Sequence, residues 1–118
     1  MGSRVQAFHS SDEWKNLFTS LKDSSQLIVI DFTATWCPPC RMMAPIFADL
    51  AEKFTEVVFV KIDVDELKDV CEEFEVEAMP TFIFIKQGVV VDKIVGAGKN
   101  ELEKKIELHK TPETSITT

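Results

Sequence analysis

The spacing of apolar residues along this chain changes repeatedly between the period of a helix and that of a strand. One helix is predicted by four large apolar residues at the i, i+3, i+4, i+7 spacing: Trp14, Leu17, Phe18 and Leu21. Ser10 and Glu13 form a capping-box signature at its start. Residues 27–33, in contrast, are apolar on both alternating faces, which is typical of a strand that helices cover on both sides.

The rest of the chain continues this alternation. The further predicted elements are a short strand at residues 5–9, a helix from Arg41 to Phe54, a strand at 57–63, a short helix with apolar positions from Leu67 to Phe74, strands at 81–86 and 89–95, and a last helix containing Leu102 and Ile106. Gln87-Gly88 is a hairpin signal between the last two strands. We expect Asp65 to cap the short helix and Asn100 to cap the last helix.

The predicted order is therefore β-α-β-α-β-α-β-β-α. The first strands need crossover connections and should be parallel, whereas the two strands of the final hairpin must be antiparallel. This order predicts an α/β fold with one mixed central sheet and helices on both faces. We expect a single domain over residues 1–118, with frayed tails at 1–4 and 110–118.

Composition adds limits on partners and compartment. The 118 residues are 45% hydrophobic and 28% charged, which is ordinary for a globular domain. The formal net charge of −7 argues against a nucleic-acid partner and against an anionic membrane. No apolar run resembles a signal peptide or is long enough to span a bilayer, so we expect a cytoplasmic protein. In a reducing compartment, paired cysteines are more typical of catalysis or metal binding than of a structural disulfide.

Cys37 and Cys40 stand at C-x-x-C spacing where the buried strand gives way to the next helix. Within a βαβ pattern this spacing is typical of a redox-active dithiol. The helix N-terminus favours a thiolate at Cys37, because unpaired N–H groups and the helix dipole attract negative charge. A structural disulfide and half of a zinc site are the alternatives, but zinc needs four ligands as a rule, and the other candidates are only Cys71, His9 and His109. We expect Cys71 to be a buried, inert thiol.

We therefore predict thiol–disulfide exchange without a metal. Cys37, the N-terminal and more exposed sulfur, is the expected nucleophile, and Cys40, one turn inside the helix, is the expected resolving thiol. Pro38 and Pro39 have no N–H groups, so the first helical turn should offer the Cys37 thiolate fewer donors.

Asp31 lies within the apolar strand, where burial disfavours a carboxylate and should raise its pKa. One interpretation is that it exchanges protons at the site. The other is that it is a structural residue paired with Lys61 on the neighbouring strand. We favour proton transfer, because carboxylates with a perturbed pKa cluster at functional sites.

Four motifs in register resemble those of the thioredoxin family: Asp31-Phe32-x-Ala34-x-Trp36-Cys37-x-Pro39-Cys40, Lys61-Ile62-Asp63, Met79-Pro80-Thr81 and Val95-Gly96-Ala97. The resemblance covers about residues 5 to 109 and is closest to the cytosolic h-type thioredoxins of plants. It implies the thioredoxin fold and the reduction of disulfides in target proteins by a monomer with no bound cofactor, through the redox-active disulfide Cys37–Cys40. It also implies that an NADPH-dependent, flavin-containing thioredoxin reductase supplies the electrons, and that Asp31, with Lys61 as its partner, accepts the proton of the resolving cysteine.

By the same resemblance, target proteins would dock around the cysteines, on Trp36 and on the Pro38-Pro39 turn. Trp36 is either a core residue or an exposed platform for the target chain, and we favour the platform because Trp36 stands beside the reactive cysteine. Met79-Pro80 resembles the family's cis-proline loop, in which the backbone of Met79 pairs with the target peptide as a strand does. Gly96, between Val95 and Ala97, would allow a close approach of the target backbone, or it is simply a turn at a strand end.

The chain departs from the usual family motif at Pro38, where Gly is usual. The Cys-Pro-Pro-Cys form occurs in some h-type members and also resembles the tryparedoxin and nucleoredoxin branches, so a reductase of that type is one alternative. A binding module with a thioredoxin fold, whose docking groove matters more than redox turnover, is another. The two cysteines, Asp31 and the Met79-Pro80 motif favour catalysis.

Overall fold

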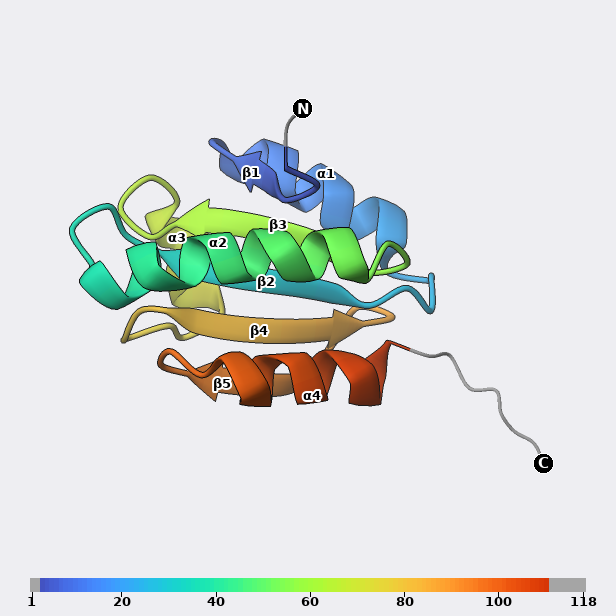
Figure 1. The fold of residues 1–118 in the computed structure, drawn as a ribbon. Coiled ribbons are helices and arrows are strands. Elements are labelled where there is room, and N and C mark those ends of the chain that lie inside the picture. The colour runs from blue at the N-terminus through green and yellow to red at the C-terminus, as the bar shows by residue number, and fades with distance from the viewer. Residues whose placement is uncertain (1–2, 111–118) are drawn as a thin grey trace.

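The computed structural model describes residues 3–110, which form a five-stranded mixed sheet flanked by four helices (Figure 1). In chain order the elements are β1 (Gln6–Phe8), α1 (Ser11–Leu21), β2 (Ile28–Thr33), α2 (Pro38–Lys53), β3 (Val58–Asp63), α3 (Lys68–Glu73), β4 (Thr81–Lys86), β5 (Val89–Val95) and α4 (Lys99–His109). The predicted order of elements is confirmed, with small shifts at several ends. The largest is in α2, which begins at Pro38, inside the C-x-x-C motif.

The strands lie in the order β1-β3-β2-β4-β5. β1 and β2 are both parallel to β3, and β4 is antiparallel to β5, so the predictions of parallel first strands and an antiparallel hairpin are confirmed. β4 is also antiparallel to β2, although the helix α3 precedes it. In Figure 1, α2 and α4 lie together over the near face of the sheet, and α1 and α3 lie on the far side. The predicted fold class, an α/β fold with helices on both faces, is therefore confirmed.

Two apolar clusters fill the two faces. The cluster on one side joins Trp14 of α1 and Val70 of α3 to Ile30 and Phe32 of β2. The other joins residues of α2 and α4 to the opposite side of the sheet. Successive side chains of a strand point to opposite faces, so Asp31, between Ile30 and Phe32, points to the face that α2 covers. Its partner in the register on β4, Phe82, belongs to the α2 and α4 cluster.

Helix capping differs from the predictions in three places. At α1, the Ser10 hydroxyl accepts the Glu13 N–H at 3.2 Å as predicted, but the Glu13 carboxylate accepts from His9 N–H instead of closing the box on Ser10. The cap predicted at Asp65 is wrong, because the N-cap residue of α3 is Leu67 and it has no side-chain cap bond. The cap predicted at Asn100 is also wrong, because α4 begins at Lys99 and Asn100 lies within its first turn.

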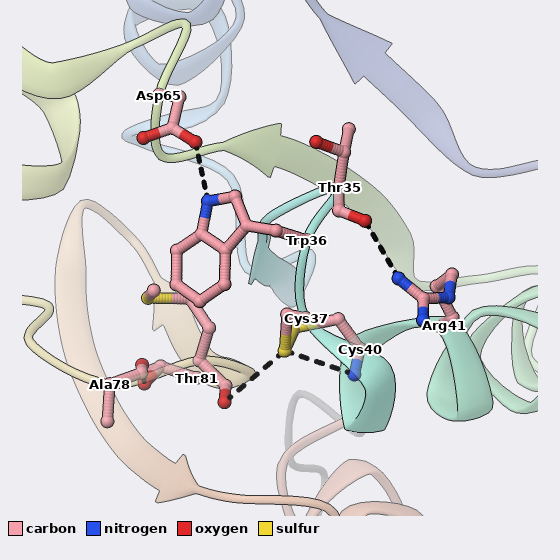
Figure 2. The surroundings of a disulfide bond; sticks show 9 residues. Thr35, Trp36, Cys37, Cys40, Arg41, Asp65, Ala78 and Thr81 are labelled. Atoms are coloured by element: carbon pink, nitrogen blue, oxygen red, sulfur yellow. Dashed lines mark hydrogen bonds between the residues drawn. A yellow bond between two sulfur atoms is a disulfide. The ribbon is translucent and has the colours of Figure 1, made fainter.

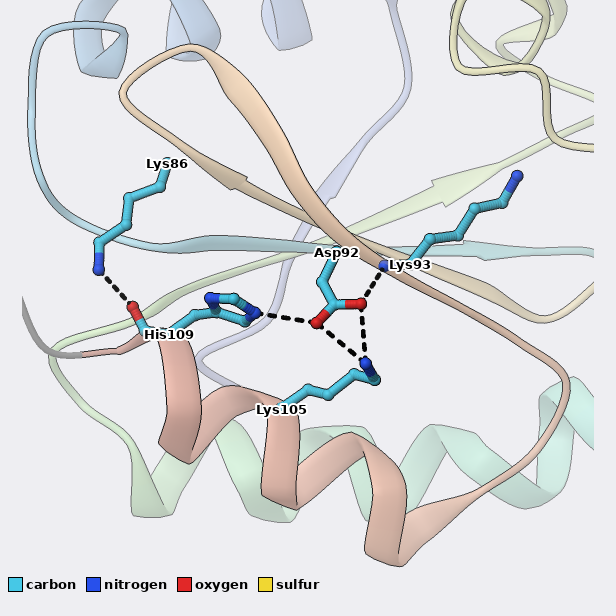
Figure 3. Close-up of polar contacts among 5 residues, drawn as sticks. All are labelled: Lys86, Asp92, Lys93, Lys105 and His109. Atoms are coloured by element: carbon cyan, nitrogen blue, oxygen red, sulfur yellow. Dashed lines mark hydrogen bonds and ion pairs between the residues drawn. The ribbon is translucent and has the colours of Figure 1, made fainter.

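The β4–β5 hairpin and α4 are held together at the β5 edge of the sheet, opposite β1. Gln87 and Gly88 have φ angles of 52° and 76°, and two positive values are the signature of the tight hairpin turn that the sequence predicts. From β5, the Asp92 carboxylate contacts the ammonium of Lys105 at 2.8 Å and His109 Nε2 at 2.9 Å, both on α4 (Figure 3). Burial acts to raise the pKa of Asp92, but the hydrogen bonds from Lys105 and His109 outweigh it and lower the pKa to about 2. This cluster fixes α4 against β5, and the sequence gives no local sign of it.

Residues 1–2 and 111–118, which make up much of the two predicted tails, lie outside the described residues. At the edges of the described part, Arg4 donates to the Thr55 carbonyl at 3.2 Å, and the Lys110 N–H donates to the Ile106 carbonyl at 2.9 Å. Between residues 3 and 110 no helix has the length and apolar character needed to cross a membrane.

Candidate active site

Cys37 and Cys40 form a disulfide at the N-terminus of α2, where the chain leaves β2. Cys37 is the N-cap residue and Pro38 and Pro39 fill the first two helical positions, so the first available helix donor is the N–H of Cys40. That N–H points at Cys37 Sγ from 3.3 Å (Figure 2). The prediction that the double proline reduces the donors around Cys37 is therefore confirmed. After reduction, the same N–H and the helix dipole would favour a thiolate at this sulfur.

The two cysteines face different surroundings although both are almost fully buried, with exposures of 4% for Cys37 and 2% for Cys40. Cys37 is thus more exposed than Cys40, as expected, but only slightly. Cys37 Sγ lies 3.7 Å from the carbonyl oxygen of Met79, on the side of the Met79-Pro80 loop. Cys40 instead lines a cleft that also contains Asp31.

Trp36 is 61% exposed beside the disulfide, as the sequence predicts for a platform. Its indole N–H donates to the Asp65 carboxylate at 2.9 Å (Figure 2). Asp65, predicted to be a helix cap, therefore orients the indole instead. The Asp65 N–H in turn donates to the side chain of Asp63 at 2.8 Å, which sets the turn after β3.

Arg41 is a second residue that sequence reasoning missed. Its guanidinium donates to the Thr35 carbonyl at 2.9 Å (Figure 2). This bond ties the first turn of α2 to the segment that carries Trp36. The only sequence signal for it is the position of a long donor side chain directly after the motif.

The Met79–Pro80 bond is cis, which confirms the prediction made for it. The neighbouring loops are bonded to each other: the Gly96 N–H donates to the Pro80 carbonyl at 2.8 Å, and Val95 is the register partner of Thr81. Gly96 has a φ of 105°, which favours glycine, and a Cβ added there would meet no atom within 4 Å. The Met79 carbonyl faces Cys37 Sγ, and the Gly96 loop is bonded to Pro80, so both loops lie on the Cys37 side of the disulfide. Val95, next to Gly96, is 60% exposed.

Asp31 is 2% exposed, and its Oδ1 has no hydrogen-bond partner among the described residues. Burial raises the pKa of this carboxyl to about 7, against a smaller opposing effect of the Lys61 charge. Asp31 and Lys61 are register partners on β2 and β3, but no ion pair within 4.0 Å joins them in the described part of the chain. The prediction of a raised pKa is confirmed, and Lys61 acts on Asp31 through its charge and not through a direct contact.

The remaining candidates lie outside this arrangement. Cys71 was expected to be buried, but it is only partly buried, with its thiol directed at the Val76 carbonyl at 3.4 Å. Burial, with smaller effects of Glu72 and Asp65, raises its pKa, so the thiol form is favoured. His9 contacts Glu66 at 3.1 Å. Within residues 3–110 no three His, Cys, Asp or Glu side chains are grouped as a metal site.

Comparison with known proteins agrees with this geometry. The family model described as Thioredoxin matches residues 7–108. Thioredoxin H4 of Arabidopsis thaliana is 59% identical over 116 residues, which cover 98% of this chain and 94% of that protein. Thioredoxin H3 of the same plant is 56% identical over 107 residues, 91% of each protein. The crystal structure of thioredoxin NaTrxh from Nicotiana alata has a TM-score of 0.92 at 57% identity, covering 94% of this chain and 96% of that chain.

Proposed function

Because the chain belongs to the thioredoxin family and is a thiol–disulfide oxidoreductase, we propose that it reduces the disulfides of target proteins, with Cys37 attacking and Cys40 resolving. The observation that carries this assignment is the difference between the two sulfurs. Cys37 caps α2 and faces the Met79 carbonyl, whereas Cys40 lies one turn inside and faces the side of Asp31.

The reaction has two exchange steps. The Cys37 thiolate attacks one sulfur of the target disulfide, forms a mixed disulfide and expels the other target sulfur as a thiolate. The Cys40 thiolate then attacks Cys37 Sγ, which re-forms the Cys37–Cys40 disulfide and releases the second target sulfur. The two electrons held by the dithiol have passed to the target, and the protein is left in the oxidised form that the structure contains.

Asp31 supplies the base for the second step. Cys40 must lose its proton before it can attack, and its buried position favours the neutral thiol. A carboxyl with a pKa of about 7 is half ionised near neutral pH, and so it can take a proton there and give it back afterwards. Lys61, as the neighbouring charge, keeps this pKa from rising further.

Target peptides bind on the side of the disulfide away from Asp31. Trp36 and the exposed Val95 provide apolar surface, and the backbone of Met79 pairs with the extended target chain. Pro38 and Pro39 form a stiff turn beneath the target, and Gly96-Ala97 leaves space for its backbone. The Trp36–Asp65 bond holds the platform in place before the target arrives.

Several wider assignments follow from family membership. Residues 1–118 would form one thioredoxin domain that works as a monomer in the cytosol, without a bound cofactor. An NADPH-dependent thioredoxin reductase would restore the dithiol after each turnover. Support for this donor comes from relatives that are themselves named thioredoxins, at 59% and 56% identity over most of the chain.

Reduction of insulin tests the reaction and the donor together. With dithiothreitol, the wild-type protein should accelerate insulin reduction and Cys37→Ser should not. With NADPH and a plant thioredoxin reductase in place of dithiothreitol, turnover should continue, and it should exceed turnover with glutathione and glutaredoxin. Turnover with glutathione and glutaredoxin but not with the reductase would support the proposed reaction, but it would refute thioredoxin reductase as the electron donor.

A further inference from the structure

A groove of about 270 Å³ adjoins the proposed docking surface, because Trp36 and Met79 belong to both. The rest of its lining comes from the turn after β3, from α3 and from the segment between α3 and Met79. Cys37 Sγ lies 3.7 Å from the Met79 carbonyl oxygen, so the groove begins next to the sulfur that attacks the target. A target chain bonded to Cys37 would therefore pass its mouth.

The inner wall of this groove is apolar. Val64 and Val76 are buried there, and Met79 beside them is partly buried. Trp36 forms one side, and the bond from its indole N–H to the Asp65 carboxylate at 2.9 Å holds the ring in place (Figure 2). Such a wall favours the aliphatic stem of a long side chain, and the face of an indole attracts a cation.

The rim of the groove is acidic. Three carboxylates line it, those of Asp65, Glu72 and Glu77, and the ammonium of Lys68 offsets one of them, so two negative charges are in excess. Glu72 and Glu77 are exposed, and among the described residues no ion pair or side-chain hydrogen bond occupies their carboxylates. Burial, and then the charges of Glu72 and Asp65, raise the pKa of the Cys71 thiol in the same groove, so both carboxylates lie near it. The rim therefore complements a positive charge.

A residue of the target can reach this groove while the target cysteine is under attack. In an extended chain successive side chains point to opposite faces, so the residues two positions before and two positions after a cysteine point to the same side as that cysteine. When the target cysteine faces Cys37 and its chain pairs with the backbone of Met79, one of these two residues faces the groove.

We propose that the groove binds the side chain of an arginine two residues from the attacked cysteine, so that the protein prefers target disulfides with such a neighbour. The aliphatic stem packs on Val64 and Val76, and the guanidinium lies against Trp36 and the carboxylates of Glu72 and Glu77. Arginine fits better than lysine, because a guanidinium is planar, stacks on aromatic rings and is more weakly hydrated than an ammonium. This preference rests on the proposed function, since it concerns the target of the first exchange step.

The experiment measures how fast the reduced protein reduces short capped peptides that contain one disulfide and are otherwise neutral. In one series the tested residue stands two positions before the first cysteine, and in the other it stands two positions after the second. In each series this residue is Arg, Leu, Gln or Glu. Acid quenching and chromatography separate the reduced and oxidised peptides, so no electron donor takes part. Each rate is divided by the rate of the same peptide with dithiothreitol, which corrects for the effect of the charge on the disulfide itself.

In one of the two series, the Arg peptide should react about three- to tenfold faster than the Gln peptide at low salt, and the Glu peptide should be the slowest. High salt should bring these rates closer together. Glu72→Gln combined with Glu77→Gln should bring the Arg-to-Gln ratio close to unity. Glu73→Gln combined with Glu75→Gln is the matched control, because it removes the same charge from exposed residues that do not line the groove, and it should keep the ratio. Lys68→Gln should increase the ratio.

Three results would overturn the proposal. These are equal rates for the Arg and Gln peptides in both series, a Leu peptide as fast as the Arg peptide, and an equal loss of preference in the two double variants. The last result would trace the preference to the net charge of −7 and not to the groove. In all three cases, reduction of the Gln peptide would leave the proposed disulfide chemistry standing. If none of the peptides were reduced, the proposed function itself would be refuted.

Discussion

Replacing Asp31 by Asn should change the stability of the protein in a way that depends strongly on pH. Burial raises the pKa of Asp31 from 3.8 to about 7, a difference of about 3 units. At about 1.4 kcal/mol per unit this corresponds to about 4 kcal/mol. Between these two pKa values the folded protein keeps a proton that the unfolded chain has lost, so stability of the wild type falls as pH rises through that window. The amide of the variant has no acidic proton to lose, so the variant should keep this stability.

The free energy of unfolding of the oxidised wild type and of Asp31→Asn should be measured in guanidinium chloride at pH 4, 6 and 8. Burying the Asn amide changes the stability of the variant by an amount that does not vary with pH. The test is therefore how the difference between the two unfolding free energies changes with pH. The unfolding free energy of Asp31→Asn minus that of the wild type should grow by about 4 kcal/mol from pH 4 to pH 8. Parallel pH curves for the two proteins would refute the reasoning, because they would mean that the carboxyl of Asp31 ionises equally in the folded and unfolded states.

Three further predictions concern Asp92, Gly96 and the kinetic role of Asp31. Asp92→Asn should show the opposite pH dependence, because the low pKa of about 2 means that the Asp92 carboxylate stabilises the fold above pH 4. The variant should lose about 1–2 kcal/mol of unfolding free energy at pH 7, and this loss should shrink between pH 4 and pH 2. A loss of the same size at pH 2 would contradict this prediction. Gly96→Ala should cost about 1–2 kcal/mol in thermal or denaturant unfolding because of its φ of 105°. Gly98→Ala should cost less, because Gly98 has a φ of −141° and an added Cβ would make only ordinary contacts, at 3.8 Å, with the Glu101 side chain. Equal costs would remove the backbone argument. In rapid-mixing kinetics, Asp31→Asn should slow resolution by Cys40 more than attack by Cys37, and an unchanged resolution rate from pH 6 to 8 would make Asp31 a structural residue.

Local patterns predicted the parts of the fold that depend on neighbouring residues. The apolar stripe of α1, the doubly buried β2 and the positive-φ turn at Gln87-Gly88 all follow from spacing and turn chemistry over a few residues. The raised pKa of Asp31 could be predicted for the same reason, since a carboxylate flanked by apolar residues on a central strand cannot avoid burial.

What the sequence could not show are contacts between elements far apart in the chain. Asp65 resembles a helix cap because it precedes an apolar stripe, but Trp36, 29 residues away, binds its carboxylate. Likewise, His109 looked like an ordinary residue near the chain end, yet the docking of α4 on β5 brings it to Asp92, 17 residues away. In both cases a tertiary hydrogen bond decides the role of a residue whose local signal suggested another role or none.

The most direct test of the proposed mechanism is a trapping experiment with the two cysteine variants. Reduced Cys40→Ser and Cys37→Ser would each be mixed with a protein disulfide such as insulin, and intact masses would be recorded without a reducing agent. If Cys37 attacks and Cys40 resolves, Cys40→Ser should accumulate a lasting mixed disulfide with the target, because the resolving thiolate is missing. Cys37→Ser should form almost none, since its remaining thiol lies inside the turn of α2 on the side of Asp31. Capture of insulin by Cys37→Ser as efficiently as by Cys40→Ser would contradict the assignment of the two sulfurs.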